Sequence, residues 1–179
     1  MTTTVTEALA EIKTIGKRLE KKYEFVFANL ARQEGAKDPL EKDGGSVTAL
    51  VREQQAIGDL QKRILDLRRG IQRANDATSV GVNGTTRTIS EWLVWRRDVA
   101  PKQKEFLSKV TQGLKGLREN SRRQGFNVVG IGGSPQTSTD VVVNISESEI
   151  AAQAERIEDT LGQLDGQLSL KNATTFVDA

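Results

Sequence analysis

The sequence has 179 residues, with 26 lysines and arginines against 24 aspartates and glutamates, a formal net charge of +2, no cysteine and no histidine. The lack of cysteine excludes disulfides and thiolate chemistry, and the lack of histidine removes the usual general base and the commonest metal ligand. We therefore interpret the chain as a non-enzyme without a metal or other cofactor. Since no apolar run is long enough for a membrane span or a signal peptide, we expect cytoplasmic synthesis and no membrane partner.

The charges are unevenly distributed along the chain. Residues 1–124 contain 24 basic and 16 acidic side chains, whereas residues 125–179 contain 2 basic and 8 acidic ones. We interpret residues 1–124 as a basic, three-helix antiparallel domain. Residues 125–179 are interpreted as an assembly arm with a β-hairpin, an acidic helix and an extended tail. An acidic segment can dock on a basic one, within one subunit or between two.

The first predicted helix runs from Thr6 to Glu34 and stops at Gly35. Its apolar positions repeat at alternating spacings of four and three residues, which is the heptad pattern of a helix seam. The seam positions are Val5, Leu9, Ile12, Gly16, Leu19, Tyr23, Val26 and Leu30. Gly16 leaves a notch in this seam, where a facing backbone or a large side chain can approach closely.

The second predicted helix begins after Ser46, which is the expected N-cap, and runs to Asn75. Its seam consists of Leu50, Ile57, Leu60, Ile64, Leu67, Ile71 and Ala74. After this helix, Asn83 and Gly84 lie between alternating residues, which is the strongest short signal for a β-hairpin. Because the flanking strands are short, a simple loop is the alternative.

The third predicted helix opens with a capping box formed by Thr88 and Glu91. Pro101 interrupts the helix, since an interior proline removes one backbone hydrogen bond and clashes with the preceding turn. We expect a kink between Asp98 and Pro101 and the end of the helix near Arg123.

The next segment predicts a second β-hairpin, with strands at residues 126–131 and 141–145. An isolated two-stranded hairpin is marginal in water, so we expect another subunit or partner to complete its sheet. The glycines of "VVGIGGS", residues 128–134, also suggest a phosphate loop. A polar loop and another strand follow, however, in place of the helix that a nucleotide fingerprint requires.

The fourth predicted helix opens with a second capping box, formed by Ser146 and Glu149. The fold class is therefore mainly α: an elongated antiparallel helical bundle or coiled coil of four long helices with two short β-hairpins. The residues expected to mediate homo-oligomerisation are Val128, Val129, Ile131, Val141, Val142, Val143, Ile157, Leu161, Leu164 and Leu168.

Four stretches, "EALAEIKTIGKRLE", "ANLARQEG", "LQKRILDLRRGIQRANDAT" and "TRTISEWLVWRRD", resemble a family of small, uncharacterised bacterial helical proteins, some of which are labelled septicolysin. The resemblance covers about residues 6–118. It implies a long antiparallel helical domain and no established activity. The segment after residue 124 is an addition to this pattern.

Antiparallel pairing of the second and third helices predicts an arginine-rich end. The candidates for binding an anion or a partner there are Arg68, Arg69, Arg73, Arg87, Trp95, Arg96 and Arg97. Arginine contacts phosphate and carboxylate in bidentate geometry and stacks on aromatic rings. Three interpretations stay open: structural ion pairs with nearby acids, docking of an acidic protein segment, and binding of a phosphate ligand. Trp92 falls on the helix seam and is expected in the core, whereas Trp95 falls off it.

These observations lead to three hypotheses about function. The first is a non-enzymatic structural or assembly protein that forms homo-oligomers and contacts other proteins of a large assembly, for which we suggest a bacteriophage virion. The second is a binding module of the anti-defence type that sequesters a small anion or a nucleotide at the arginine-rich end. The third, less favoured, is a nucleic-acid-associated helical protein, because the basic patches contain interleaved acids and lack aromatic side chains for stacking.

Overall fold

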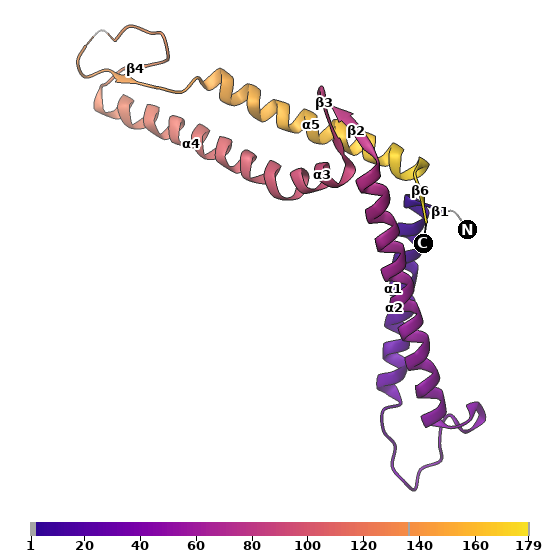
Figure 1. The fold of residues 1–179 in the computed structure, drawn as a ribbon. Helices are drawn as coiled ribbons and strands as arrows, with labels where there is room; N and C mark the ends of the chain where they lie inside the picture. Colours follow the sequence, from indigo (N-terminus) through magenta and orange to yellow (C-terminus); the bar gives the residue numbers. More distant parts are fainter. Residues whose placement is uncertain (1–2, 136, 179) are drawn as a thin grey trace. The chain divides into compact units, whose positions relative to one another are not determined.

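The computed structural model describes residues 3–135 and 137–178 of the chain and is mainly α-helical (Figure 1). The chain divides into two compact units, Met1–Thr78 with Ser169–Ala179, and Ser79–Leu168, called here the first and the second unit. This division differs from the predicted boundary at residue 124: the boundary after Thr78 divides the predicted three-helix domain, and the end of the last helix belongs to the first unit. The predicted fold class, mainly α with four long helical segments, is confirmed for the described residues.

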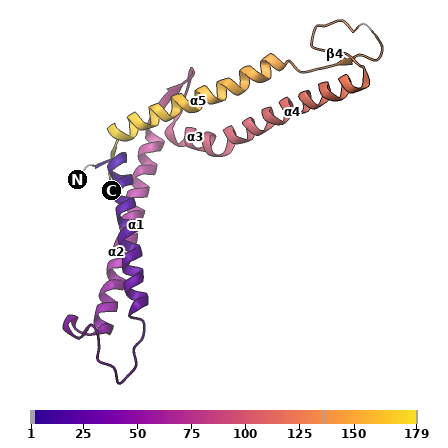
Figure 2. The same cartoon turned by 180° about the vertical axis from the view of Figure 1, so that it is seen from behind.

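In the first unit, α1 (Val5–Ala28) and α2 (Ser46–Ala77) run antiparallel and lie side by side in both views (Figures 1 and 2). Their facing apolar stripes form the core. The buried residues of this core are Val5, Ala8, Ile15, Leu19, Leu67 and Val177. Two ion pairs close one flank of the helix pair, Arg63 with Glu11 at 2.8 Å and Lys22 with Glu53 at 2.6 Å.

The first helix ends at Ala28, six residues before the predicted end at Glu34. The side-chain amide of Asn29 donates a hydrogen bond to the carbonyl of Phe25 at 2.8 Å and so caps the last turn. Leu30, the last predicted seam position, is exposed. Since most of the stability of a helix in a protein comes from packing of its apolar face, nothing favours continuing the helix to this residue.

The second helix is capped by Asp38 and not by Ser46, which corrects the prediction. Gly45 occupies the N-cap position. The Asp38 carboxylate accepts hydrogen bonds from the backbone N–H of Ser46 at 2.8 Å, from the Ser46 hydroxyl at 2.5 Å and from the N–H of Leu40 at 2.8 Å. These hydrogen bonds lower the pKa of Asp38 to about 2. A short 3₁₀ turn, Glu41–Asp43, lies between this acid and the helix.

Two segments near opposite ends of the sequence pair in the first unit. Strand β1 (Thr3–Thr4) pairs antiparallel with β6 (Phe176–Val177), and Thr3 lies opposite Val177. The tail was predicted to be extended from residue 171, but residues 171–174 belong to the last helix and only residues 175–178 are extended. This extended part is also packed, because Val177 is buried in the core. Gly70 of α2 makes room for it: a Cβ there would lie 2.4 Å from a methyl of Val177 and 2.9 Å from the carbonyl oxygen of Asp178.

In the second unit, β2 (Ser79–Val82) and β3 (Thr85–Thr88) form the first predicted hairpin. The turn residues Asn83 and Gly84 both have positive φ, 46° and 76°, as a type I′ turn requires. The predicted capping box at Thr88 and Glu91 is also confirmed, and it opens α3 (Ile89–Val94).

The third predicted helix is not α-helical throughout, and its irregular part lies just before Pro101, where a disturbance was predicted. A π-helical segment, Trp95–Val99, separates α3 from α4 (Ala100–Gln124), and Pro101 lies in the first turn of α4. A π-bulge is a common cause of a helix kink and is frequent at functional sites.

The second predicted hairpin is wrong. Strands β4 (Val128–Val129) and β5 (Val141–Val142) have two residues each and pair in parallel. The intervening loop makes two further turns, closed by Gly133 N–H to Gly130 O at 3.0 Å and Asp140 N–H to Thr137 O at 3.2 Å. The loop thereby brings the chain back to run in the same direction as β4, which a tight hairpin cannot do.

The last helix, α5 (Glu147–Thr174), follows this loop. The Ser146 hydroxyl accepts a hydrogen bond from the N–H of Glu149 at 3.3 Å, which is half of the predicted capping box. In the second unit the core consists of Val80, Val82, Ile89, Trp92, Leu164 and Leu168. It therefore joins the β2–β3 hairpin, α3 and α5.

Candidate functional site

An open cleft of about 760 Å³ lies in the second unit and is lined by three separate parts of the sequence. The β2–β3 hairpin, the α3–α4 helix and α5 each contribute side chains. The lining residues are Val82, Asn83, Thr85, Arg87, Trp92, Trp95, Gln103, Arg156, Asp159 and Thr160.

The tip of the hairpin is fixed against α5 by Asn83. Its side-chain amide donates to the hydroxyl of Thr160 at 2.8 Å, and its backbone N–H donates to the side chain of Gln163 at 3.3 Å. Asparagine is one of the few residues that accept the positive φ of this turn, so a single side chain shapes the turn and attaches it to the helix. The hairpin wall of the cleft is therefore held in place.

The two tryptophans have different roles in the cleft wall. Trp92 is only 3% exposed, and its indole N–H donates to the carbonyl of Val80 at 3.1 Å, so it belongs to the core as predicted. Trp95 stands perpendicular to it, with ring centroids 5.5 Å apart and an interplanar angle of 89°. Because Trp95 is half-buried, part of its ring is available to a ligand.

Two guanidinium groups border the cleft. Arg87 lies over the ring of Trp92, with its Cζ atom 5.0 Å from the ring centroid, and Arg156 comes from α5. In the part of the chain that the structure describes, neither forms an ion pair. Asp159, which also comes from α5, is the one carboxylate among the lining residues, so the cleft lining carries a net positive charge.

A second cleft of about 410 Å³ continues from the first one between α4 and α5. It shares Gln103 and Arg156 with the larger cleft and adds an apolar surface. The added residues are Phe106, Leu107, Gln153 and Ile157. Together the two clefts form a groove that is charged at one end and apolar at the other.

The seven predicted anion or partner candidates are divided between the two units. Arg87 and Trp95 line the cleft of the second unit. Arg96 pairs with Asp165 at 2.7 Å, and Arg97 makes a bidentate contact with Asp98 at 2.8 and 2.9 Å. Hydrogen bonding within the Arg97–Asp98 pair raises the pKa of Arg97 and lowers that of Asp98. Both guanidinium groups are therefore already paired with acids, as one of the three interpretations expected.

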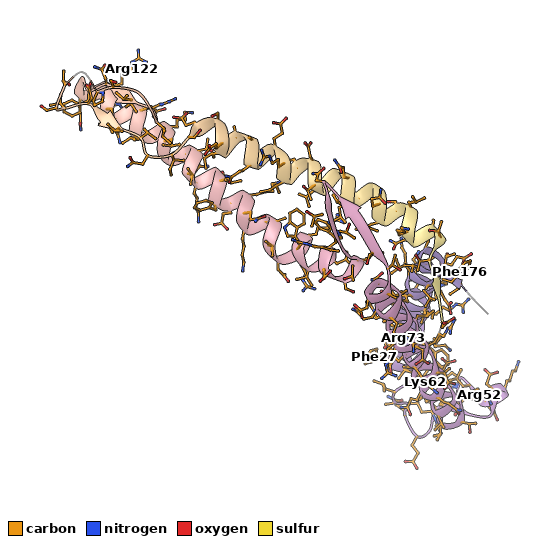
Figure 3. The ribbon with its side chains drawn as sticks, turned by 45° about the horizontal axis from the view of Figure 1, so that its top comes forward. Phe27, Arg52, Lys62, Arg73, Arg122 and Phe176 are labelled. Carbon is orange, nitrogen blue, oxygen red and sulfur yellow. The ribbon has the colours of Figure 1, made fainter. Side chains whose placement is uncertain are left out.

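The other three candidates belong to α2 of the first unit. Arg68 and Arg69 are exposed. Arg73 donates a hydrogen bond to the carbonyl of Asp178 at 2.7 Å and thereby holds the C-terminal strand against α2. Arg73 and Phe176, both labelled in Figure 3, line the same small pocket. We find a structural role for Arg73 and none for the other two.

Sequence reasoning missed six polar residues of the cleft: Asn83, Thr85, Gln103, Arg156, Asp159 and Thr160. One signal was present. Arg156 is one of only two basic residues among residues 125–179, the other being Lys171, in a segment with eight acidic residues.

Several residues predicted for homo-oligomerisation are covered by the chain itself. Leu164 and Leu168 pack against the hairpin and Trp92, and Val143 is also buried. These three are unavailable to a partner, which corrects their assignment. Val128, Val129, Val141, Ile157 and Leu161 are half-buried, whereas Ile131 and Val142 are exposed.

Among the described residues, no group of three or more acidic side chains is arranged to hold a metal ion. The helices of this part of the chain also include none that is both long and apolar enough to cross a membrane.

No family profile matches the sequence, and no curated protein matches it. A solved structure of a functionally unknown conserved protein from Corynebacterium diphtheriae is similar, with 22% sequence identity and a TM-score of 0.53. The likeness covers 99% of this chain and 100% of that one. It shows the fold alone.

Proposed function

We propose that the protein is a non-enzymatic binding module that holds a small anionic ligand with an aromatic ring, such as a nucleotide, in the cleft of the second unit. The observation that carries this proposal is the position of Arg87 and Arg156 at the border of one cleft whose wall includes Trp95. The cleft volume of about 760 Å³ falls within the range of small-molecule sites.

Each part of such a ligand has a matching group in the cleft. The two guanidinium groups offer planar donors to a phosphate, and the half-buried ring of Trp95 offers a surface for stacking a base. Gln103 and Thr85 supply hydrogen-bond donors and acceptors, and Asp159 can accept hydrogen bonds from ribose hydroxyls. We assign no catalytic step, because these side chains include no strong nucleophile and no pair of carboxylates for acid–base work.

A thermal-shift panel on the purified protein tests the proposal. The panel contains adenosine and guanosine mono- and triphosphates, with adenosine alone and inorganic phosphate alone as half-ligands. We expect the nucleotides to raise Tm and the half-ligands to have smaller effects, since a ligand that binds only the folded state stabilises it. If neither the nucleotides nor the half-ligands change Tm, the proposal is wrong.

Matched variants locate the site. Arg87→Gln and Arg156→Gln should each weaken nucleotide binding about 10- to 100-fold, the loss of one charged hydrogen-bonding partner. Arg122→Gln removes the same charge near the far end of α4, where Figure 3 labels the residue, and should bind like the wild type. Equal weakening by Arg122→Gln would mean a diffuse charge effect. Strong retention on DNA that is lost at high salt would favour the nucleic-acid hypothesis.

A second candidate function is a structural or assembly role, and it is favoured by an apolar surface at the tip of the α1–α2 pair. Phe27 at the end of α1 is 71% exposed and Val47 at the start of α2 is 78% exposed; Leu30 and Val51 nearby are also exposed. Contiguous exposed apolar side chains are characteristic of protein contact surfaces. We propose that other proteins of a large assembly bind this tip, a bacteriophage particle being the setting that we suggest.

A further inference from the structure

The two flanks of the α1–α2 pair have opposite character. The ion pairs of Glu11 with Arg63 and of Lys22 with Glu53 close one flank. On the other flank, Leu9, Gly16 and Tyr23 follow one another at intervals of seven residues, so they form a row along α1. Leu9 is 46% exposed and Tyr23 is 37% exposed.

Residues of α2 lie beside this row on the same flank. Gln61 donates a hydrogen bond to the hydroxyl of Tyr23 at 3.1 Å, which places it on the same flank. Leu65 follows one helical turn later and is 48% exposed. The apolar row on α1 therefore widens into a patch that is open to solvent in the described structure.

The row is symmetric about Gly16. Leu9 lies seven residues before it and Tyr23 seven residues after it. A side chain at position 16 would meet nothing within 4 Å, so the glycine leaves an open notch at the centre of the row. A twofold axis through this notch would place Leu9 of each chain against Tyr23 of the other, and the missing side chain would let the two helix backbones approach closely.

The charges beside the row are arranged with nearly the same symmetry, centred half a residue after Gly16. Lys13 precedes Gly16 by three residues, Glu20 follows it by four, and both are exposed next to the row. The same twofold axis would bring Lys13 of each chain close to Glu20 of the other. The flank is thus complementary to itself in shape and in charge, as an interface between two identical subunits requires.

We propose that α1 is a homodimer interface, in which two copies of this chain cross antiparallel at Gly16 with Leu9 packed on Tyr23 and Lys13 paired with Glu20 across the twofold axis. The occupant of the apolar patch is a second copy of the chain. This inference is independent of the ligand proposed for the second unit.

Charge reversal tests the interface on the full chain by sedimentation equilibrium. We expect the wild type to be dimeric. Lys13→Glu and Glu20→Lys should each raise the dissociation constant at least about tenfold, because each creates two like-charge contacts. The double variant Lys13→Glu/Glu20→Lys should recover the dimer. Arg52→Glu, an equal charge reversal on the ion-pair flank of α2, serves as the control and should leave the dimer unchanged.

A steric variant separates folding from association. Gly16→Leu fills the notch, so it should abolish the dimer while circular dichroism reports an unchanged or more stable helix. A monomeric wild type, failure of the double variant to recover the dimer, or a dimeric Gly16→Leu protein would each overturn the proposal. The ligand titrations with the Arg87 and Arg156 variants are read separately and do not depend on this result.

Discussion

Trp95 stands edge-on against Trp92 at 5.5 Å between ring centroids, and Trp92 donates its indole N–H to the carbonyl of Val80 at 3.1 Å. Trp92 thus holds the hairpin and α3 together, while Trp95 rests on it and presents part of its ring to the cleft. The two residues should respond differently to truncation.

Trp92→Ala should therefore destabilise the protein by about 3–5 kcal/mol, the usual effect of removing a buried large aromatic side chain. Trp95→Ala should lower the unfolding free energy less, because the ring is only half-buried. Urea unfolding followed by circular dichroism measures both values. Equal effects would show that Trp95 is also a core residue and would weaken its assignment to a ligand.

Gly70 and Gly16 offer a matched pair of helix glycines. Gly70→Ala should destabilise the first unit by about 1–3 kcal/mol, because the new Cβ would overlap Val177 and the backbone of Asp178. Gly16→Ala meets no neighbour and should stabilise the isolated chain by up to about 1 kcal/mol through helix propensity. Thermal unfolding at a concentration that keeps each protein monomeric gives the comparison. A stabilising Gly70→Ala would show that the C-terminal strand is not packed there.

Leu164 was predicted to serve a subunit interface, but it lies fully buried within the second unit. Leu164→Ala should cost about 2–5 kcal/mol of stability, since it leaves a cavity between α5 and the hairpin. The exposed residue Ile131 is the control, and Ile131→Ala should change the unfolding free energy little. Denaturant titration of both variants checks the assignment, which fails if the two substitutions cost the same.

Asp38 gives the first unit a specific acid sensitivity. Its pKa is lowered to about 2 in the folded state, so its contribution to stability is complete above the ordinary carboxyl value near 4 and is lost as the pH falls toward 2. In this window the wild type should lose Tm faster than Asp38→Ala. Asp43→Ala, in the same loop, should retain the steeper wild-type dependence. Parallel slopes for the wild type and Asp38→Ala would contradict the capping role.

The features that could be predicted from the sequence are those decided by a few neighbouring residues. The capping box at Thr88 and Glu91 and the turn at Asn83 and Gly84 each depend on local backbone chemistry, and both are confirmed. The disturbance at Pro101 was also expected, although the sequence did not specify that it would take the form of a π-helical segment.

The features that could not be predicted depend on residues far apart in the sequence. Asp38 competes with Ser46 for the start of α2 from eight residues away, and the loop before Val141 reverses the expected strand direction. The cleft joins Arg87 of the hairpin to Arg156 of α5. Periodicity identifies the buried face of each helix, but it does not specify which polar residues of different helices converge on one cleft.

The pairing of Thr3 with Val177 has a practical consequence for protein engineering. Because β1 and β6, near opposite ends of the sequence, are neighbours in one small sheet, a short peptide could link these two strands without disturbing α1 or α2. New termini could then be opened in the polar segment between Ala28 and Ser46, producing a circularly permuted protein that keeps the helix pair.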